Sequence, residues 1–522
     1  MGAHGAPPPS RFNFAQHVLA RNAGRAAKAA YIDDGQTLTF GELALATGRM
    51  ARTFSRLGIR REERVFVCMH DTVDLPVVFL GALCAGVVPV AINTLLTVDD
   101  YAYMLEHSRA QALLVSGALL PTLQQAMARG AHEVRHIVVS RPAGPLPADA
   151  HDLAALLAGE TAEPPAAAPT LADDIAFWLY SSGSTGRPKG TVHTHGNLYW
   201  TAETYGLPIL GVREDDVVFS AAKLFFAYGL GNALTFPLSA GATTILMAER
   251  PTPQAVFRRL VERKPTIFCG VPTLYAAMLA APELPTRADV RLRRCASAGE
   301  ALPKEVGERF AARFGCDVLD GIGSTEMLHI FLSNRPGEVR YGTTGTPVPG
   351  YDVELRGEDG RLVADGEIGD LFIRGPSAAL MYWANREQSR TTFQGAWTKS
   401  GDKYVRDTDG YFTYSGRSDD MLKVAGQYVS PFEVEGALMR HDAVLEAAVV
   451  GKTEDGLTRT LAYVVLKPGH TGDAAMADAL KAFVKDQLAP FKYPREIRFE
   501  TELPKTATGK IQRFKLRERA AG

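Results

Sequence analysis

The sequence has few cysteines and little net charge, and each shortage excludes a class of protein. Its 522 residues include only 5 cysteines, scattered along the chain and without a CxxC pair. This spacing is typical of reduced thiols, so we expect a cytoplasmic protein rather than a disulfide-stabilised secreted one. The formal net charge is −1. Because no excess of basic residues attracts a polyanion, nucleic acid is not expected as a partner.

Long apolar stretches are also scarce. The first residues contain no apolar segment of the kind found in secretory signals. One uncharged stretch, residues 75–92, reaches the minimum length of a membrane-spanning helix, but Gly86 and Pro89 interrupt it. We therefore expect a buried helix followed by a buried strand, and no membrane association.

Apolar, β-branched runs alternate with helical patterns over the first two-thirds of the chain, as at 64–69, 73–85 and 87–92. This alternation predicts an α/β fold in which helices cover both faces of the sheets. The composition, 46% hydrophobic and 22% charged, is that of a globular protein long enough for more than one domain.

The sequence pattern changes twice in the last third of the chain. From about 341 to 414 glycines are frequent and the expected strands are short, which predicts a β-rich subdomain. After the charged turn GRSDD at 416–420 the pattern predicts a small α+β domain, with a helix near 474–487 and a final strand at 496–499. We expect a large N-terminal domain of stacked α/β sheets over 1–417 and a small, mobile C-terminal domain over 418–522.

The segment YSSGSTGRPKG at 180–190 carries the clearest chemical signal. It follows an apolar strand, and its glycines and hydroxyls let backbone N–H and side-chain O–H groups converge on an anion. A flexible linker is the alternative, but a linker rarely follows a buried strand directly. The loop is not of the Walker A type, because the spacing GxxxxGK(S/T) is absent. The candidate phosphate-binding residues are Ser181, Ser182, Gly183, Ser184, Thr185, Gly186 and Lys189.

With this loop, the motifs SAGEALP, GIGSTE, TKSGD, GRSDD and PKTATGKIQR stand in an order that resembles the adenylate-forming superfamily. That superfamily contains acyl- and aryl-CoA synthetases, peptide-synthetase adenylation domains and luciferases. The resemblance covers essentially the whole chain. It implies an ATP-dependent acid:coenzyme A ligase that uses ATP, Mg²⁺ and coenzyme A and passes through an acyl-adenylate.

The resemblance assigns the first nucleotide contacts. It implies that Ala298, Gly299 and Glu300 of SAGEALP border the purine. In GIGSTE, Thr325 is expected to bond the α-phosphate and Glu326 to hold Mg²⁺, a hard cation that prefers oxygen ligands. The adjoining pocket residues are Gly321, Ile322 and Gly323, and Ile322 replaces the aromatic residue usual in the family.

The remaining roles fall in the last quarter of the chain. Asp402 is implied to bind the ribose hydroxyls, Tyr414 to lie beside the nucleotide, and Arg417 to reach the ribose or phosphate. Lys510 is implied to bridge the acid carboxylate and the α-phosphate, where a cation offsets the charge of two meeting anions. The resemblance makes Asp419 the hinge and Gly426 part of the coenzyme A channel.

The resemblance places the segment AAKLFFAYGLGN at the superfamily's acid-binding motif, and it lacks the aspartate with which peptide-synthetase domains pair an amino acid's ammonium group. Ala227, Tyr228, His329 and Ile330 are the candidate acid-binding residues. Phe225 or Phe226, or both, are alternatively core residues, and His329 is as readily a structural histidine as a ligand. His193 and His195 have a metal-like spacing, but without a third ligand a structural role is expected.

An uncharged, aromatic-lined site suits benzoate, and the sequence looks most like benzoate-CoA ligases. The alternatives are a ligase for hydroxybenzoate, aminobenzoate or a fatty acid, an adenylation enzyme that loads a carrier-protein thiol, a luciferase-like oxygenase, and a non-enzymatic nucleotide-binding regulator. The sequence leaves the oligomeric state open, with a homodimer as one option.

Overall fold

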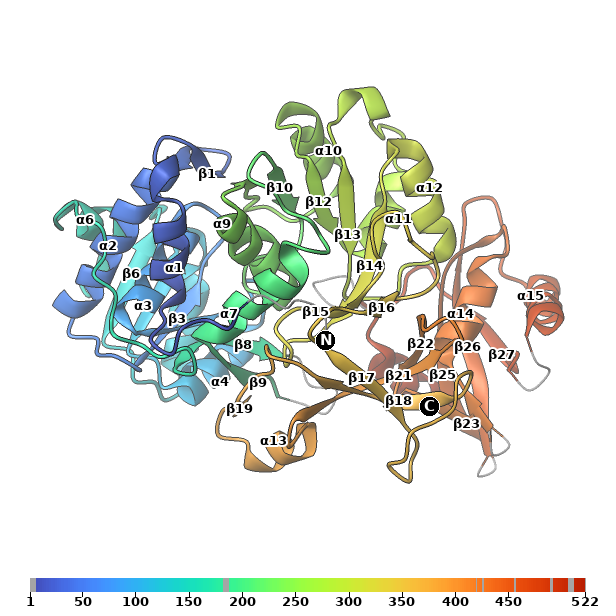
Figure 1. Cartoon of the computed structure of the whole chain (residues 1–522). Coiled ribbons are helices and arrows are strands. Elements are labelled where there is room, and N and C mark those ends of the chain that lie inside the picture. The colour runs from blue at the N-terminus through green and yellow to red at the C-terminus, as the bar shows by residue number, and fades with distance from the viewer. Residues whose placement is uncertain are drawn as a thin grey trace. The chain divides into compact units, whose positions relative to one another are not determined.

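The computed structural model of the chain describes residues 6–181, 187–418, 420–424, 427–454, 457–488, 492–505 and 511–521 (Figure 1). By their internal contacts the residues form two units, Met1–Val353 with Ile373–Lys399, and Glu354–Phe372 with Ser400–Gly522. The domain boundary expected after residue 417 lies within the second unit and stays a prediction.

An eight-stranded sheet in the first unit carries the strands on either side of the glycine-rich loop. The strand order is β19-β9-β8-β4-β3-β5-β6-β7, parallel from β8 to β7 and antiparallel at β8–β9 and β9–β19. Its strands are β3 (Arg64–Cys68), β4 (Val88–Ala91), β5 (Ala112–Ser116), β6 (His136–Ser140), β7 (Ala150–Asp152), β8 (Ile175–Ser181), β9 (Lys189–Thr194) and β19 (Met381–Tyr382).

The uncharged stretch at 75–92 forms a helix and a strand of this sheet, as expected. Helix α3 (Asp74–Ala85) is buried almost throughout and packs against α2 (Phe40–Arg56). Gly86 then ends it in the left-handed region, at φ +71°, and β4 follows. Within the described part of the chain no helix is both long and apolar enough to cross a bilayer.

A nine-stranded sheet in the same unit carries the purine-side and acid-side motifs, in the order β16-β15-β14-β13-β12-β10-β11-β1-β2. The run from β14 to β1 is parallel. Its strands are β1 (Ala29–Ile32), β2 (Thr37–Thr39), β10 (Val217–Ser220), β11 (Thr243–Ile245), β12 (Ile267–Gly270), β13 (Arg294–Ser297), β14 (Val318–Gly323), β15 (Ile330–Ser333) and β16 (Thr346–Pro347).

Helices flank both sheets, and inner strands such as β4, β5 and β12 are accordingly buried along their whole length. Alongside α2 and α3 they are α1 (Phe14–Arg21), α4 (Val98–Ser108), α5 (Leu120–Arg129), α6 (Leu153–Ala158), α7 (His195–Thr201), α8 (Ala227–Leu230), α9 (Phe236–Ala240), α10 (Pro253–Glu262), α11 (Pro272–Ala280), α12 (Lys304–Phe314) and α13 (Arg386–Thr392), with short 3-10 turns η1 (Ala23–Arg25), η2 (Gly117–Leu119) and η5 (Arg287–Asp289) and π-helical turns η3 (Ala202–Gly206) and η4 (Gly231–Thr235).

The β-rich segment expected near 341–414 forms a five-stranded sheet. Strands β17 (Asp352–Arg356), β18 (Ile368–Arg374), β21 (Trp397–Arg406) and β20 (Phe393–Gln394) pair in that order, and β22 (Phe412–Arg417) pairs with β21.

The C-terminal part of the second unit contains the small α+β arrangement expected from the sequence. Strand β25 (Val444–Glu454) pairs antiparallel with β26 (Leu457–Leu466), which pairs parallel with β27 (Glu496–Phe499). Helix α15 (Ala474–Gln487) and β27 have the predicted bounds. The other elements are the hairpin β23 (Leu422–Val424)–β24 (Gln427–Val429) and helices α14 (Pro431–Met439) and α16 (Arg513–Ala521).

Candidate functional site

The ends of the glycine-rich loop are held together by strand pairing. Strands β8 and β9 run antiparallel, with Ser181 opposite Lys189. Ser181 is half-buried, and its hydroxyl has no hydrogen-bond partner among the described residues. A buried hydroxyl without a partner is uncommon and suits a ligand or water. The loop residues Ser182, Gly183, Ser184, Thr185 and Gly186 lie outside the described residues.

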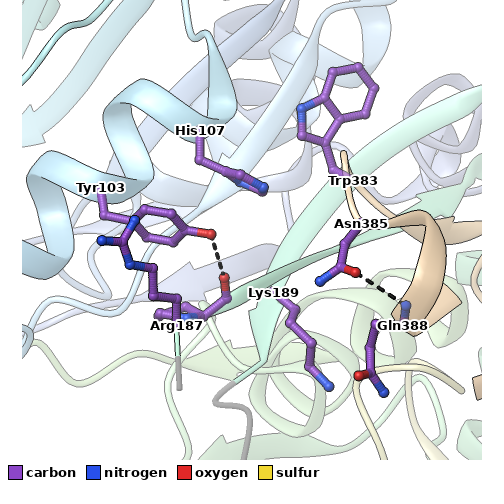
Figure 2. Close-up of a pocket in the computed structure, with 8 residues that line it drawn as sticks. Tyr103, His107, Arg187, Lys189, Trp383, Asn385 and Gln388 are labelled. Atoms are coloured by element: carbon purple, nitrogen blue, oxygen red, sulfur yellow. Dashed lines mark hydrogen bonds between the residues drawn. The ribbon is translucent and has the colours of Figure 1, made fainter. Parts of the chain in front are cut away.

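A pocket of about 200 Å³ opens beside the exit of this loop (Figure 2). The Arg187 guanidinium lies over the Tyr103 ring at 5.0 Å, and the Tyr103 hydroxyl donates to the Pro188 carbonyl at 3.3 Å. The residues lining it are Tyr103, His107, Arg187, Pro188, Lys189, Trp383, Asn385 and Gln388. They include basic side chains and amides but no carboxylate, so this edge of the sheet favours an anion.

The segment Thr325–Glu326, expected to meet the α-phosphate and metal, follows β14 and is anchored by a buried histidine. His193 Nε2 lies 2.7 Å from the Thr325 carbonyl oxygen, and Asn197 Nδ2 lies 2.9 Å from His193 Nδ1. Burial lowers the pKa of His193 to about 4. The neutral imidazole therefore donates through Nε2 to Thr325 and accepts from Asn197 through Nδ1.

His195 has an equally local role. Its Nδ1 accepts a 3.3 Å hydrogen bond from the Phe14 N–H, and burial lowers its pKa to about 4. Both histidines of the TVHTHGN segment are thus hydrogen-bonded within the protein, in agreement with the structural role expected for them.

Glu326 is held at both its backbone and its side chain. The Ala379 N–H donates to the Glu326 carbonyl at 2.7 Å, and the Tyr382 hydroxyl donates to Glu326 Oε1 at 2.6 Å. Lys189 Nζ lies 3.4 Å from the same hydroxyl oxygen and 4.4 Å from the Tyr382 ring centroid. Tyr382 therefore joins two predicted site residues, Lys189 and Glu326.

The chain turns sharply after Glu326. Leu328 has φ +64°, a left-handed conformation that is uncommon for a residue with a side chain. The Leu328 N–H donates to the Thr325 carbonyl at 3.2 Å, and the Ser377 hydroxyl donates to the Met327 carbonyl at 2.7 Å. Such strain persists only where surrounding contacts impose it, and it concentrates at functional sites.

This turn directs His329 into an aromatic cluster, which we define as Tyr205, Tyr228, Phe236 and His329. The ring centroids of the other three lie 4.6 to 5.6 Å from that of His329. Burial lowers the pKa of His329 to about 3, so its imidazole is neutral. Its Nε2 donates to the Tyr228 carbonyl at 3.3 Å, and its Nδ1 has no partner among the described residues.

The other acid-side predictions fall around this cluster. Ala227 begins α8, and Ile330 begins β15 and is buried. Phe225 belongs to the hydrophobic core and Phe226 packs against it, which confirms the alternative that at least one of them is a core residue. A side chain at Gly231 would overlap the His329 ring, which explains a glycine at this close approach.

The purine-side motifs lie on neighbouring strands. Strand β13 ends at Ser297, opposite Asp320 of β14, so the turn Ala298–Glu300 and the segment Gly321–Gly323 leave the same sheet edge. Gly299 has φ +93°, and a Cβ at Gly323 would lie 2.5 Å from the His329 carbonyl oxygen. Ile322 is half-buried, opposite Leu332 of β15.

Two residues near these motifs were missed by the sequence reasoning. One is Tyr382, which no sequence pattern marks because a tyrosine after a methionine on a short strand is ordinary. The other is Asp320, whose pKa burial raises to about 8. A carboxylate in the apolar run CDVLDGIG was a signal, since buried carboxyl groups are rare without a function.

The ribose-side residues lie in the second unit. Asp402 of β21 pairs with Arg417 of β22, with Arg417 Nη1 3.3 Å from Asp402 Oδ1. The Asp402 side chain is 11% exposed and that of Arg417 40%. Tyr414 lies on β22, and its ring contacts Phe432 at 4.8 Å. The predicted hinge Asp419, channel residue Gly426 and catalytic Lys510 lie outside the described residues.

The fold is that of an α/β protein with a glycine-rich loop between paired strands. Residues 18–383 match the AMP-binding enzyme family, and residues 433–510 match the AMP-binding enzyme C-terminal domain. The chain belongs to the AMP-binding enzyme family. The predicted resemblance to adenylate-forming enzymes is confirmed.

Full-length relatives include ligases of aromatic acids. The benzoate–CoA ligase of Thauera aromatica is 58% identical over 514 residues, 98% of this chain and 96% of that protein. A benzoate CoA ligase structure from Burkholderia xenovorans LB400 is 62% identical with TM-score 0.91, covering 97% of this chain and 100% of that one. The anthranilate CoA ligase AuaEII, in complex with anthranoyl-AMP, is 40% identical with TM-score 0.93, covering 98% of each chain. These structures confirm the predicted α/β fold class.

Proposed function

We propose that the protein is an ATP-dependent aryl acid:coenzyme A ligase whose preferred acid is benzoate. The acid reacts with ATP to give an aryl-AMP and pyrophosphate, and coenzyme A then takes the aryl group as a thioester and releases AMP. The observation that carries the choice of acid is the uncharged aromatic cluster around His329, which follows Glu326 by three residues. Because its histidine is neutral, no full charge in this cluster opposes an apolar ring or demands a charged substituent.

The donor set at Glu326 fits Mg²⁺. Glu326 offers a carboxylate and Thr325 a hydroxyl, and Mg²⁺ is commonly bound by one or two carboxylates together with substrate phosphates. When bound, the ion would neutralise charge on the phosphates. Thr325 would bond the α-phosphate, and the turn at Ala298–Glu300 would border the purine.

The second unit supplies the remaining proposed groups. Asp402 would accept hydrogen bonds from the ribose hydroxyls, with Arg417 at its side and Tyr414 near the nucleotide. Lys510 would bridge the carboxylate and the α-phosphate during adenylation. We propose that residues 418–522 then turn about Asp419, withdraw Lys510 and bring Gly426 to the coenzyme A channel.

One observation favours a second candidate substrate, a benzoate carrying a hydrogen-bond donor. Since His329 Nε2 carries the proton that bonds the Tyr228 carbonyl, Nδ1 presents a lone pair with no partner among the described residues. A ring hydroxyl or amino group that reached this atom would satisfy it. Hydroxybenzoate or aminobenzoate would then compete with benzoate.

The test is a substrate panel with ATP and Mg²⁺, with and without coenzyme A, in which pyrophosphate and thioester are measured. Benzoate should release the most pyrophosphate, and thioester should form only when coenzyme A is present. Release of pyrophosphate without thioester would instead indicate a carrier-protein acceptor, and light with oxygen uptake a luciferase-like reaction. If ATP binds but no acid releases pyrophosphate, the ligase proposal is wrong.

The proposed setting of the reaction is the cytoplasm, with small molecules as partners. All five cysteines are buried free thiols, which fits a reducing compartment.

A further inference from the structure

We propose that Tyr382 is a positioning residue that fixes the Glu326 carboxylate for its metal ion and couples it to Lys189 at the phosphate-loop exit. The inference rests on the proposed function and names a residue that the motifs do not contain. Tyr382 itself need not touch ATP. It would act through the two side chains on either side of its hydroxyl group.

The protein backbone holds Tyr382 in place from several directions. Strand β19 pairs with β9, with Tyr382 opposite Thr191, and the Trp383 N–H donates to the Gly190 carbonyl at 2.8 Å. The Ser389 hydroxyl accepts from the Tyr382 N–H at 3.0 Å. The side chain is buried, at 3% exposure. The phenol hydroxyl therefore has a fixed position relative to the strand that leaves the phosphate loop.

From that position Tyr382 restrains one of the two Glu326 oxygens. The 2.6 Å bond from the Tyr382 hydroxyl to Oε1 is short, as expected for an O–H donor to an ionised carboxylate. Among the described residues, the Tyr382 hydroxyl is the one group that forms a hydrogen bond with the Glu326 side chain. One oxygen is thus fixed by the protein, and the other would be left to bind a hard cation. Partners of this kind commonly change metal affinity by about 10- to 100-fold when removed.

Lys189 completes the coupling. It lies opposite Ser181 across the loop, and its ammonium group contacts both the hydroxyl oxygen and the ring face of Tyr382. A donor to the phenol oxygen polarises the O–H bond toward Glu326. A phosphate that draws Lys189 toward the loop would change this donation, so loop occupancy and metal-ligand orientation would be linked.

The matched variants are Tyr382→Phe and Tyr101→Phe. Tyr382→Phe keeps the ring that Lys189 faces and removes only the hydroxyl. Tyr101 is also a buried tyrosine whose hydroxyl donates to the Asn93 carbonyl at 2.9 Å and accepts from the Leu96 N–H at 3.2 Å, and it belongs to no site described above. Loss of a buried hydroxyl alone would affect both variants, whereas loss of carboxylate positioning would affect only Tyr382→Phe.

The first readout is the affinity of the full-length protein for Mn²⁺ in the presence of ATP, which electron paramagnetic resonance measures. We expect Tyr382→Phe to weaken Mn²⁺ binding by about 10-fold and Tyr101→Phe to leave it unchanged. The second is the Mg²⁺ dependence of benzoate-driven pyrophosphate release. Tyr382→Phe should need about 10-fold more Mg²⁺ for half-maximal rate and recover most of kcat at saturating Mg²⁺.

A double-mutant comparison separates positioning from general damage. In a Glu326→Gln background, Tyr382→Phe should have little further effect on Mn²⁺ binding, because the group that it positions is gone. Unchanged Mn²⁺ binding in Tyr382→Phe, or an equal loss in both backgrounds, would overturn the inference. Failure of the proposed function is recognised separately, since the unmodified protein would then release no pyrophosphate with any acid while the metal measurement still stands.

Discussion

Glu326 in the first unit and Asp402 in the second are both carboxylates expected at the nucleotide, but the protein holds them by opposite means. Glu326 accepts a hydrogen bond from a neutral tyrosine hydroxyl at 2.6 Å. Asp402 lies 3.3 Å from the guanidinium of Arg417, a permanently charged partner. Among the described residues Glu326 has no direct ion pair, with Lys189 reaching it only through the Tyr382 hydroxyl, whereas Asp402 is paired directly with a permanent cation.

The difference matches the ligands proposed for each. A metal cation is bound by carboxylate oxygens, so a neutral donor that orients Glu326 without forming an ion pair with it is suitable. Ribose hydroxyls need only acceptor oxygens, so Asp402 can be paired with arginine and still bind them. Substitutions at the two carboxylates test this contrast. Turnover would depend in addition on Lys510, whichever carboxylate is intact.

The largest effect is expected for Lys510→Ala. Glu326 would hold the metal ion and Asp402 the ribose, whereas Lys510 would offset the negative charge that gathers as the acid carboxylate meets the α-phosphate. We expect adenylation to fall on the order of 100- to 1,000-fold, the scale of losing a key electrostatic donor. Thioester formation from preformed benzoyl-AMP should change little. The measurement is the rate of each half-reaction separately.

Lys505→Ala is the matched control for this variant, because Lys505 lies shortly before Lys510 in the sequence and is paired with Glu446. It should leave both half-reactions near the unmodified rate, since exposed ion pairs contribute little. Equal loss of the two half-reactions in Lys510→Ala would contradict the assignment.

The second-largest effect is expected for the proposed metal ligand, Glu326. Glu326→Gln keeps the shape of the side chain and removes its charge. We expect kcat for pyrophosphate release to fall on the order of 100-fold, with a higher Mg²⁺ requirement, because an amide is a poor magnesium ligand. Rates measured across a Mg²⁺ series give both values. A variant with normal Mg²⁺ dependence would show that Glu326 is no metal ligand.

Asp402→Asn tests the other side of the contrast and should be milder. The amide keeps one acceptor oxygen, so the ribose loses a charged hydrogen-bond partner worth about 1.5 kcal/mol. We expect KM for ATP to rise about 10-fold, with little change in the Mg²⁺ requirement. Asp352→Asn, at an exposed pair with Arg374, is the control. A shifted Mg²⁺ dependence in Asp402→Asn would break the proposed division between the two carboxylates.

Much of the scaffold was predictable because local signals agreed with the tertiary structure. The uncharged run at 75–92 became α3 and β4 because a glycine ends the helix and the β-branched run that follows suits a buried strand. Helix α15 and strand β27 were predicted to the residue. The π-helical turns η3 and η4 were not predicted, since their side chains carry no periodicity distinct from that of an α-helix.

At the candidate site, motifs indicated which residues matter but not how they are held. Tyr382 is distant from Glu326 in sequence, and the bond between them exists only because β19 pairs with β9. His193 was expected to be structural from its spacing, yet its bond to the Thr325 carbonyl depends on the packing of β9 against the turn after β14. Contacts of this kind are non-local, so a single sequence does not reveal them.

The smallest effect concerns acid stability and again separates the two carboxylates. The Glu326 segment rests on His193, whose pKa burial lowers to about 4, whereas Arg417 beside Asp402 does not titrate in this range. Between pH 6.5 and pH 4, His193 binds a proton in the unfolded chain, where its pKa is near 6.5, but stays neutral in the folded protein. The stability from neutral His193 is therefore complete above pH 6.5 and is lost as pH falls from 6.5 toward 4, by about 2 kcal/mol at pH 5.

We expect Tm to drop between pH 7 and pH 5, and to drop less in His193→Gln, whose amide can still donate to the Thr325 carbonyl. Thermal unfolding at a series of pH values measures this, and an identical pH dependence in the variant would show that the buried imidazole does not set the acid sensitivity of the segment.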